Sequence, residues 1–92
     1  MERTERPRGA AGGDAAFFHT RASRTHERAA ELHEAAATLQ AEHAIEMRDL
    51  GEEESAERAD RLADRERQLA AKERLNADAE RVRAERARPA RS

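Results

Sequence analysis

The sequence contains no cysteine, tryptophan or tyrosine, and its only aromatic side chains are two phenylalanines. Without cysteine, neither a disulfide framework nor a thiolate metal site can form. No apolar run approaches the roughly 20 residues of a membrane-spanning helix. The arginines near the start are not followed by the apolar stretch of a signal peptide. These absences favour a soluble cytoplasmic protein that does not insert into membranes.

Large apolar side chains are also scarce, because only 12 of the 92 residues are Phe, Leu, Ile, Val or Met. Another 22 residues are alanine and 38 are charged, for a net charge of -2. Such a chain lacks the apolar volume for an ordinary globular core. Its main components, Ala, Glu, Arg, Leu and Gln, are nevertheless strong helix formers. The composition therefore predicts long, surface-rich helices that need a partner.

Glycine, proline and capping residues divide the chain into two helical arms. Asp14 is a candidate N-cap, although the first helix could start as late as Thr25. Gly51 is suited to end that helix, and the acidic run 52–54 suits the first turn of the next. Pro89 ends the second arm. The predicted segments are a disordered tail (1–13), helix 1 (14–50), a turn (51–54), helix 2 (55–88) and a second tail (89–92).

Apolar residues in the first arm alternate in steps of four and three, which is the spacing of a coiled-coil seam. We therefore expect an all-α fold, a long antiparallel helical hairpin that assembles into a dimeric four-helix bundle. If the chain reverses at Gly51, Leu62 falls near His43 and Leu69 near Ala36, so that large side chains meet small ones. The alternative is one continuous helix through Gly51 that dimerises. The predicted assembly residues are Phe18, Ala29, Leu32, Ala36, Leu39, Leu50, Leu62 and Leu69.

The histidines form a row, since His19, His26 and His33 recur every seven residues and His43 follows. Two ligands on one helix hold the same ion when they are three or four residues apart, a spacing that here only His43 and Glu46 have. We interpret the row as a polar border of the seam. The alternative is a metal-binding or pH-responsive module built from His19, His26, His33, His43 and Glu46.

The C-terminal end is rich in arginine, whereas residues 42–60 are acidic. In a hairpin, both features give a basic open end and an acidic tip. The basic end could contact phosphates of a nucleic acid, but no aromatic side chain there can stack on bases. Assembly of basic ends with acidic tips explains the same asymmetry. The candidate phosphate-contacting residues are Arg81, Arg83, Arg86, Arg88 and Arg91.

No motif in the sequence indicates catalysis. Gly9, Gly12 and Gly13 are neither preceded by a strand nor followed by the Lys-Ser/Thr of a phosphate-binding loop. The serines have no histidine and aspartate at a spacing that suggests a nucleophilic triad. We therefore expect a protein that is not an enzyme and has no cofactor.

The segment Thr25-His-Glu-Arg-Ala-Ala-Glu-Leu-His-Glu-Ala-Ala-Ala precedes Gly51 and an Ala/Glu/Arg-rich second arm. This pattern resembles small uncharacterised Ala/Glu/His-rich helical proteins of actinobacteria. The resemblance is compositional and implies a helical hairpin. The expected function is a non-enzymatic self-assembly or protein-interaction module, a scaffold or adaptor that forms a homo-oligomer.

Overall fold

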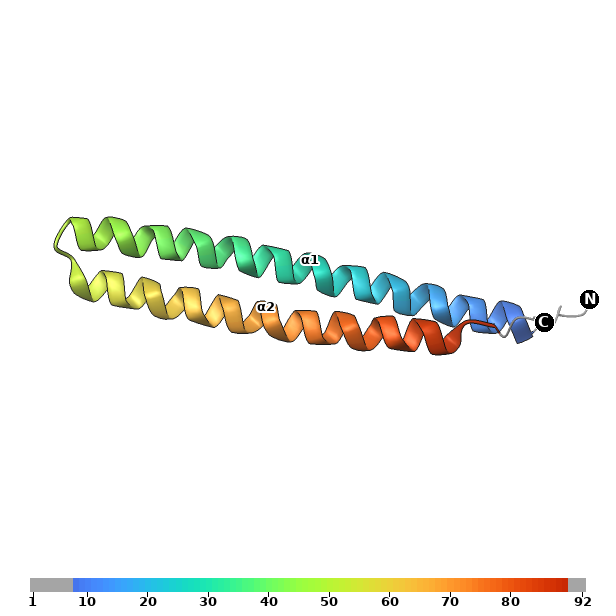
Figure 1. Cartoon of the computed structure of the whole chain (residues 1–92). Helices are drawn as coiled ribbons and strands as arrows, with labels where there is room; N and C mark the ends of the chain where they lie inside the picture. Colours follow the sequence, from blue (N-terminus) through green and yellow to red (C-terminus); the bar gives the residue numbers. More distant parts are fainter. Residues whose placement is uncertain (1–7, 90–92) are drawn as a thin grey trace, which may run out of the picture.

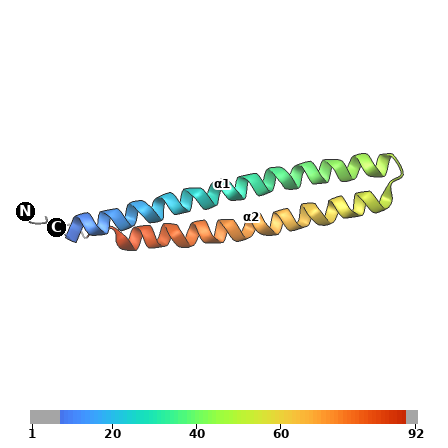
Figure 2. The ribbon, with the colours of Figure 1, turned by 180° about the vertical axis from the view of Figure 1, so that it is seen from behind.

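The chain folds into two long antiparallel helices. The computed structural model describes the backbone of residues 8–89 and the side chains of residues 13–89. Helix α1 spans Arg8–Asp49 and helix α2 spans Glu53–Ala87. They lie side by side along the length of α2, with the start of α1 and the end of α2 at the same end of the hairpin (Figure 1, and Figure 2 from behind). The predicted all-α hairpin is confirmed, and the continuous helix through Gly51 is wrong.

Helix α1 begins earlier than the sequence predicted. Its first residue is Arg8, so the predicted tail is wrong for residues 8–13, while residues 1–7 lie outside the described part of the chain. Asp14 is consequently inside the helix and is not its N-cap. The glycines of this segment do not end the helix, because glycine inside a helix weakens it by only about 1 kcal/mol.

The reversal of the chain is a glycine-closed helix end. Gly51 has a φ of 78°, in the left-handed region that glycine adopts at little cost. The amide of Glu52 donates to the carbonyl of Met47 at 2.8 Å, and that of Gly51 donates to Arg48 at 3.0 Å. These two bonds are the pattern of a Schellman motif, which satisfies the last carbonyls of α1. The predicted helix end at Gly51 is confirmed.

Helix α2 has the acidic start and the proline-limited end that the sequence predicted. Glu53 and Glu54 lie in its first turn, where the positive end of the helix dipole favours carboxylates. The helix stops at Ala87 because Arg88, which precedes Pro89, is extended with a ψ of 139°. The predicted bounds, 55–88, differ from the observed Glu53–Ala87 by two residues and one residue.

The interior of the hairpin consists of alanine. Every second turn of each helix places one small side chain against the other helix. Ser23 belongs to the α1 column, and its hydroxyl donates to the backbone carbonyl of Ala77 at 3.0 Å. A side chain as short as serine reaches the opposite backbone only when the two helices lie very close together. The fully buried residues are Ser23, Ala30, Ala37 and Ala44 in α1, and Ala56, Ala59, Ala63, Ala70, Ala77 and Ala84 in α2.

The leucines lie outside this interior. Leu32 and Leu39 are 72% and 67% exposed, and no large side chain of the described residues is fully buried. The expectation that leucines fill the seam of the hairpin is therefore wrong. Of the eight predicted assembly residues, Phe18, Leu32, Leu39, Leu50 and Leu62 are exposed, and Ala29, Ala36 and Leu69 are half-buried. Alanine columns allow a closer approach of the helices than leucine permits, and the leucines remain available on the surface.

Candidate functional site

A ladder of three histidine–glutamate pairs crosses the hairpin. The ring Nδ1 of His19 lies 2.6 Å from Glu80 Oε2, and that of His33 lies 2.6 Å from Glu66 Oε2. A carboxylate can only accept a hydrogen bond, so each Nδ1 is the donor. The histidine–glutamate ladder comprises His19–Glu80, His26–Glu73, with Nδ1 at 3.2 Å from Oε2, and His33–Glu66.

The ladder arises from matching seven-residue repeats that run in opposite directions. The histidines of α1 recur every seven residues, and so do Glu66, Glu73 and Glu80 of α2. Seven residues are nearly two helical turns, so each row stays on one side of its helix with a rise of about 10.5 Å between neighbours. The position of the histidines beside the seam was predicted from the sequence, but their glutamate partners were not. The signal that could have found these partners was the equal spacing of the two rows.

The His19–Glu80 pair, which lies nearest the open end, lowers the pKa of its carboxyl group. The hydrogen bond from His19 lowers the pKa of Glu80, and an ion pair with Arg83 at 2.6 Å lowers it further. Partial removal from water acts in the opposite direction and offsets part of this effect. Glu80 therefore stays ionised to lower pH than an ordinary glutamate, which keeps it an acceptor for His19.

The opposite face of the hairpin carries ion pairs between the helices. Glu34 meets Arg74 at 2.8 Å, and Glu27 lies 3.7 Å from Arg81. Near the tip the order of charges is reversed, because Arg48 of α1 pairs with Asp60 of α2. Hydrogen bonds to Asp60 and to Glu53 raise the pKa of Arg48. We call this side the ion-pair face.

The exposed leucines lie on the other side of the histidine–glutamate ladder. On α1, Leu32 precedes His33 by one residue and Glu34 follows it by one, and a single step turns the direction of a side chain by about 100°. Leu32 and Glu34 therefore project to opposite faces. On α2, Arg74 follows Glu73 by one residue and lies on the ion-pair face. Leu69 precedes Glu73 by four residues and is turned the other way. The leucine face, as we call the side of α1 that points away from α2, contains Phe18, Leu32 and Leu39, while Leu62 and Leu69 of α2 lie beside the ladder.

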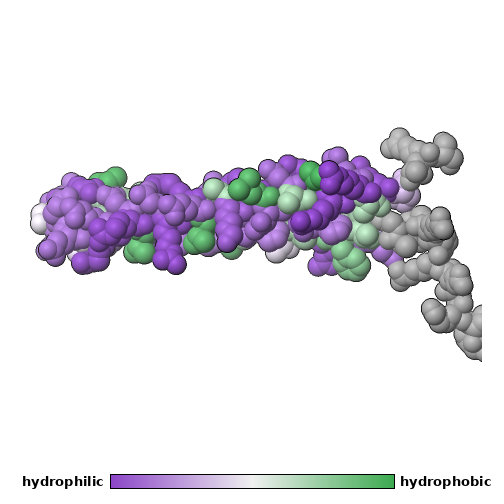
Figure 3. Space-filling view, turned by 90° about the horizontal axis from the view of Figure 1, so that it is seen from below, coloured by the Kyte–Doolittle hydropathy of each residue, from purple (hydrophilic) through white to green (hydrophobic). Residues whose placement is uncertain are grey.

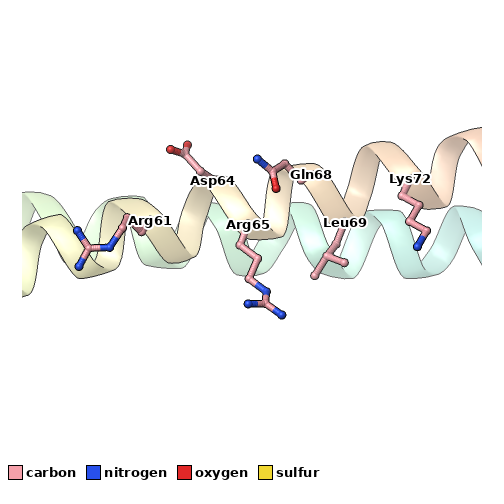
Figure 4. Close-up of a pocket in the computed structure, with 6 residues that line it drawn as sticks. All are labelled: Arg61, Asp64, Arg65, Gln68, Leu69 and Lys72. Carbon is pink, nitrogen blue, oxygen red and sulfur yellow. The ribbon is translucent and has the colours of Figure 1, made fainter.

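A surface groove lies beside Leu69 of α2. Leu69 projects to the same side of α2 as Arg65 and Lys72, whereas Asp64 projects to the opposite side (Figure 4). The groove at this point has a volume of about 540 Å³, and α2 alone supplies its lining residues. Apolar side chains form separate patches on a mostly hydrophilic surface (Figure 3). Such a surface suits contact with another helix better than enclosure of a small molecule.

Nearer the tip, a groove of about 350 Å³ is lined by both helices. His43 and Leu62 both contribute to it, as the predicted proximity of these two residues requires. His43 itself is exposed, unlike the three histidines of the ladder. His43 is therefore not part of the ladder, although the sequence grouped it with the other three histidines.

Of the remaining candidate residues, Arg81 and Arg88 line one groove near the open end of the hairpin. Within residues 13–89, no three His, Asp or Glu side chains gather closely enough to hold a metal ion. Among the candidate phosphate contacts, Arg81 pairs with Asp78 and Glu27, and Arg83 pairs with Glu80. Arg91 lies outside the described residues. In the part of the chain that is described, neither helix has an apolar stretch long enough to cross a membrane.

Comparisons with protein-family models, with curated proteins and with solved structures give no match to this chain.

Proposed function

We propose that this chain is a non-enzymatic helical assembly module of the cytoplasm, which acts as a scaffold by burying its leucine face against another helical surface. One observation carries this proposal. The buried residues of the described hairpin are all alanine or serine, with the half-buried Met47 packed against them near the tip, and nine large apolar residues stay exposed. A chain with so few large apolar residues gains little from folding alone when it leaves nearly all of them in water.

Association would supply the missing burial. Transfer of a leucine or phenylalanine side chain out of water is worth about 1.5–3 kcal/mol. Two copies that each bury Phe18, Leu32 and Leu39 would gain about 9–18 kcal/mol by this measure. The lost freedom of two associating molecules costs about 4–15 kcal/mol. The free energy gained by burying these three side chains from each copy is therefore large enough to offset the cost of association.

The histidines of the ladder are too far apart to share one ion, since neighbours are separated by a rise of about 10.5 Å, and no three His, Asp or Glu side chains of residues 13–89 gather around one point. Each histidine of the ladder already donates from Nδ1 to a glutamate of the other helix. These contacts fix the register of α1 against α2, so the ladder has a structural role within one chain. The leucine face has no such partner within the described part of its own chain.

The test is the solution mass measured by sedimentation equilibrium over a concentration series. We expect the wild-type chain to be heavier than a monomer, and the double variant Leu32→Asp/Leu39→Asp to have monomer mass. Its far-ultraviolet circular dichroism should remain helical, because neither leucine lies inside the hairpin. Wild-type protein that is monomeric at every concentration would contradict self-assembly.

The matched control is Leu75→Asp/Val82→Asp. Both side chains are large, apolar and exposed, at 70% and 46%. Leu75 follows Glu73 by two residues, which turns it by about 200° to the outer side of α2, away from the leucine face. This control should keep the mass of the wild type. If both double variants dissociate equally, the leucine face is not the assembly surface.

A further inference from the structure

The charges beside the leucines of α1 are arranged in a column with opposite signs at its two ends. Seven-residue spacing places five exposed residues on one line along the helix. The two nearer the open end are basic, the middle one is alanine, and the two nearer the tip are acidic. The column consists of Arg21, Arg28, Ala35, Glu42 and Asp49.

This charge column runs directly alongside the leucines. Arg21 follows Phe18 by three residues, and Glu42 follows Leu39 by three, so each pair is adjacent on the helix surface. All four charged residues are exposed. They lie on the side of α1 that points away from α2, because the charge column and the buried alanine column are on opposite sides of the helix. They can therefore contact a second molecule without disturbing the hairpin.

The charges of this column have no ion-pair partner among the described side chains. None of the ion pairs among residues 13–89 includes Arg21, Arg28, Glu42 or Asp49. The contact of Arg21 is with the ring of Phe17, whose centroid lies 5.8 Å from its guanidinium carbon. The ion-pair face differs, because Glu34 and Arg74 already neutralise each other across the hairpin at 2.8 Å.

We propose that a second copy of this chain packs on α1 in the inverted direction, with α1 against α1 and Ala35 near the two-fold axis. Arg28 and Glu42 each lie seven residues from Ala35, and Arg21 and Asp49 each lie fourteen residues from it. Inversion therefore brings Arg21 against Asp49 of the second copy, and Arg28 against its Glu42. This inference rests on the proposed assembly function and adds the identity and direction of the partner.

The leucines agree with this arrangement. Leu32 and Leu39 lie on either side of the same centre, so inversion sets Leu32 of one copy against Leu39 of the other. Parallel packing would instead place Arg21 over Arg21 and Asp49 over Asp49. Like charges that face each other across an interface oppose association. The order of charges along the column thus selects one of the two directions.

Reversal of charge tests the direction. In Arg21→Glu/Arg28→Glu every charge of the column is negative, and we expect the dimer dissociation constant at low salt to rise by about tenfold or more. The fourfold variant Arg21→Glu/Arg28→Glu/Glu42→Arg/Asp49→Arg restores opposite charges to each inverted pair, and its dissociation constant should return close to the wild-type value. High salt should reduce the difference between the two variants. Circular dichroism checks that each variant is helical.

Cross-linking gives an independent readout, because the chain has no natural cysteine. Thr25 and Glu46 lie in the same column as the leucines, at nearly equal distances from its centre. A short bismaleimide should join a mixture of Thr25→Cys and Glu46→Cys chains and should leave either variant alone uncross-linked. Cross-linking of Thr25→Cys with itself would indicate parallel packing and overturn the inference.

The outcomes separate the two proposals. A wild-type chain that is always monomeric contradicts both the assembly function and the inverted dimer. A wild-type dimer that loses no affinity in the doubly reversed variant contradicts only the inverted α1 contact. Loss of affinity in the double variant without recovery in the fourfold variant also contradicts the inverted contact, since compensation is what that contact requires.

Discussion

Alanine determines how closely the two helices approach. Ala70 is 3% exposed in the buried column of α2, whereas the next residue, Ala71, is exposed. Leucine at position 70 adds three carbon atoms where small side chains alone separate the helices. We expect Ala70→Leu to destabilise the hairpin by about 1–3 kcal/mol. Ala71→Leu should change stability by less than about 0.5 kcal/mol. Urea denaturation followed by circular dichroism measures both, and equal effects would contradict the alanine interior.

Glu80 should make stability depend on pH. Its pKa is lowered in the folded chain, chiefly by the hydrogen bond from His19, so folding favours the ionised carboxylate. This stabilisation is complete above the pKa of an unfolded glutamate, about 4.3, and is lost as the pH falls through the lowered folded value. Glu80→Gln should therefore be less stable than wild type at pH 7, with a difference that shrinks towards pH 2. A difference independent of pH in thermal melts would contradict this role.

At the scale of a secondary-structure element, Gly51 and Gly13 give opposite predictions for the same substitution. Added methyl groups meet nothing within 4 Å at either position, so only the backbone matters. Gly51 has a φ of 78°, where alanine costs about 1–2 kcal/mol. Gly13 lies inside α1, where alanine stabilises a helix by about 0.5–1 kcal/mol. Thermal melts should therefore show Gly51→Ala destabilised and Gly13→Ala stabilised. A stabilised Gly51→Ala would indicate that the chain had straightened into a continuous helix.

The hairpin as a whole molecule is extended rather than globular. Its radius of gyration is 21.1 Å, against about 12 Å for a compact domain of 92 residues. Its accessible surface of 7361 Å² likewise exceeds the roughly 5,400 Å² of a compact monomer of this mass. A two-helix molecule has only one internal contact surface, so each helix leaves most of its circumference exposed. Assembly through the leucine face would cover part of this excess accessible surface. The extended shape therefore agrees with the proposed role in association.

Much of the secondary structure could be predicted from the sequence, because its determinants are local. Alanine, glutamate and arginine favour helix wherever they occur, Gly51 supplies the left-handed residue at a helix end, and Pro89 forces the preceding residue out of the helix. The start of α1 was misplaced by six residues because the glycines near Gly13 weaken a helix without ending it. Gly51 between the two helical arms favoured the hairpin, with one continuous helix as the alternative.

The face that each helix buries was decided only by the tertiary structure. Two columns of apolar residues repeat every seven residues along α1, one with Leu32 and Leu39 and the other with Ala30, Ala37 and Ala44, and periodicity alone cannot rank them. Size favoured the leucines, since a larger side chain gains more from burial. The alanine column is buried because α2 offers a matching alanine column in the reverse direction, together with glutamates placed to meet the histidines. Fit between two surfaces is a property of the pair of helices, which neither arm of the sequence contains by itself.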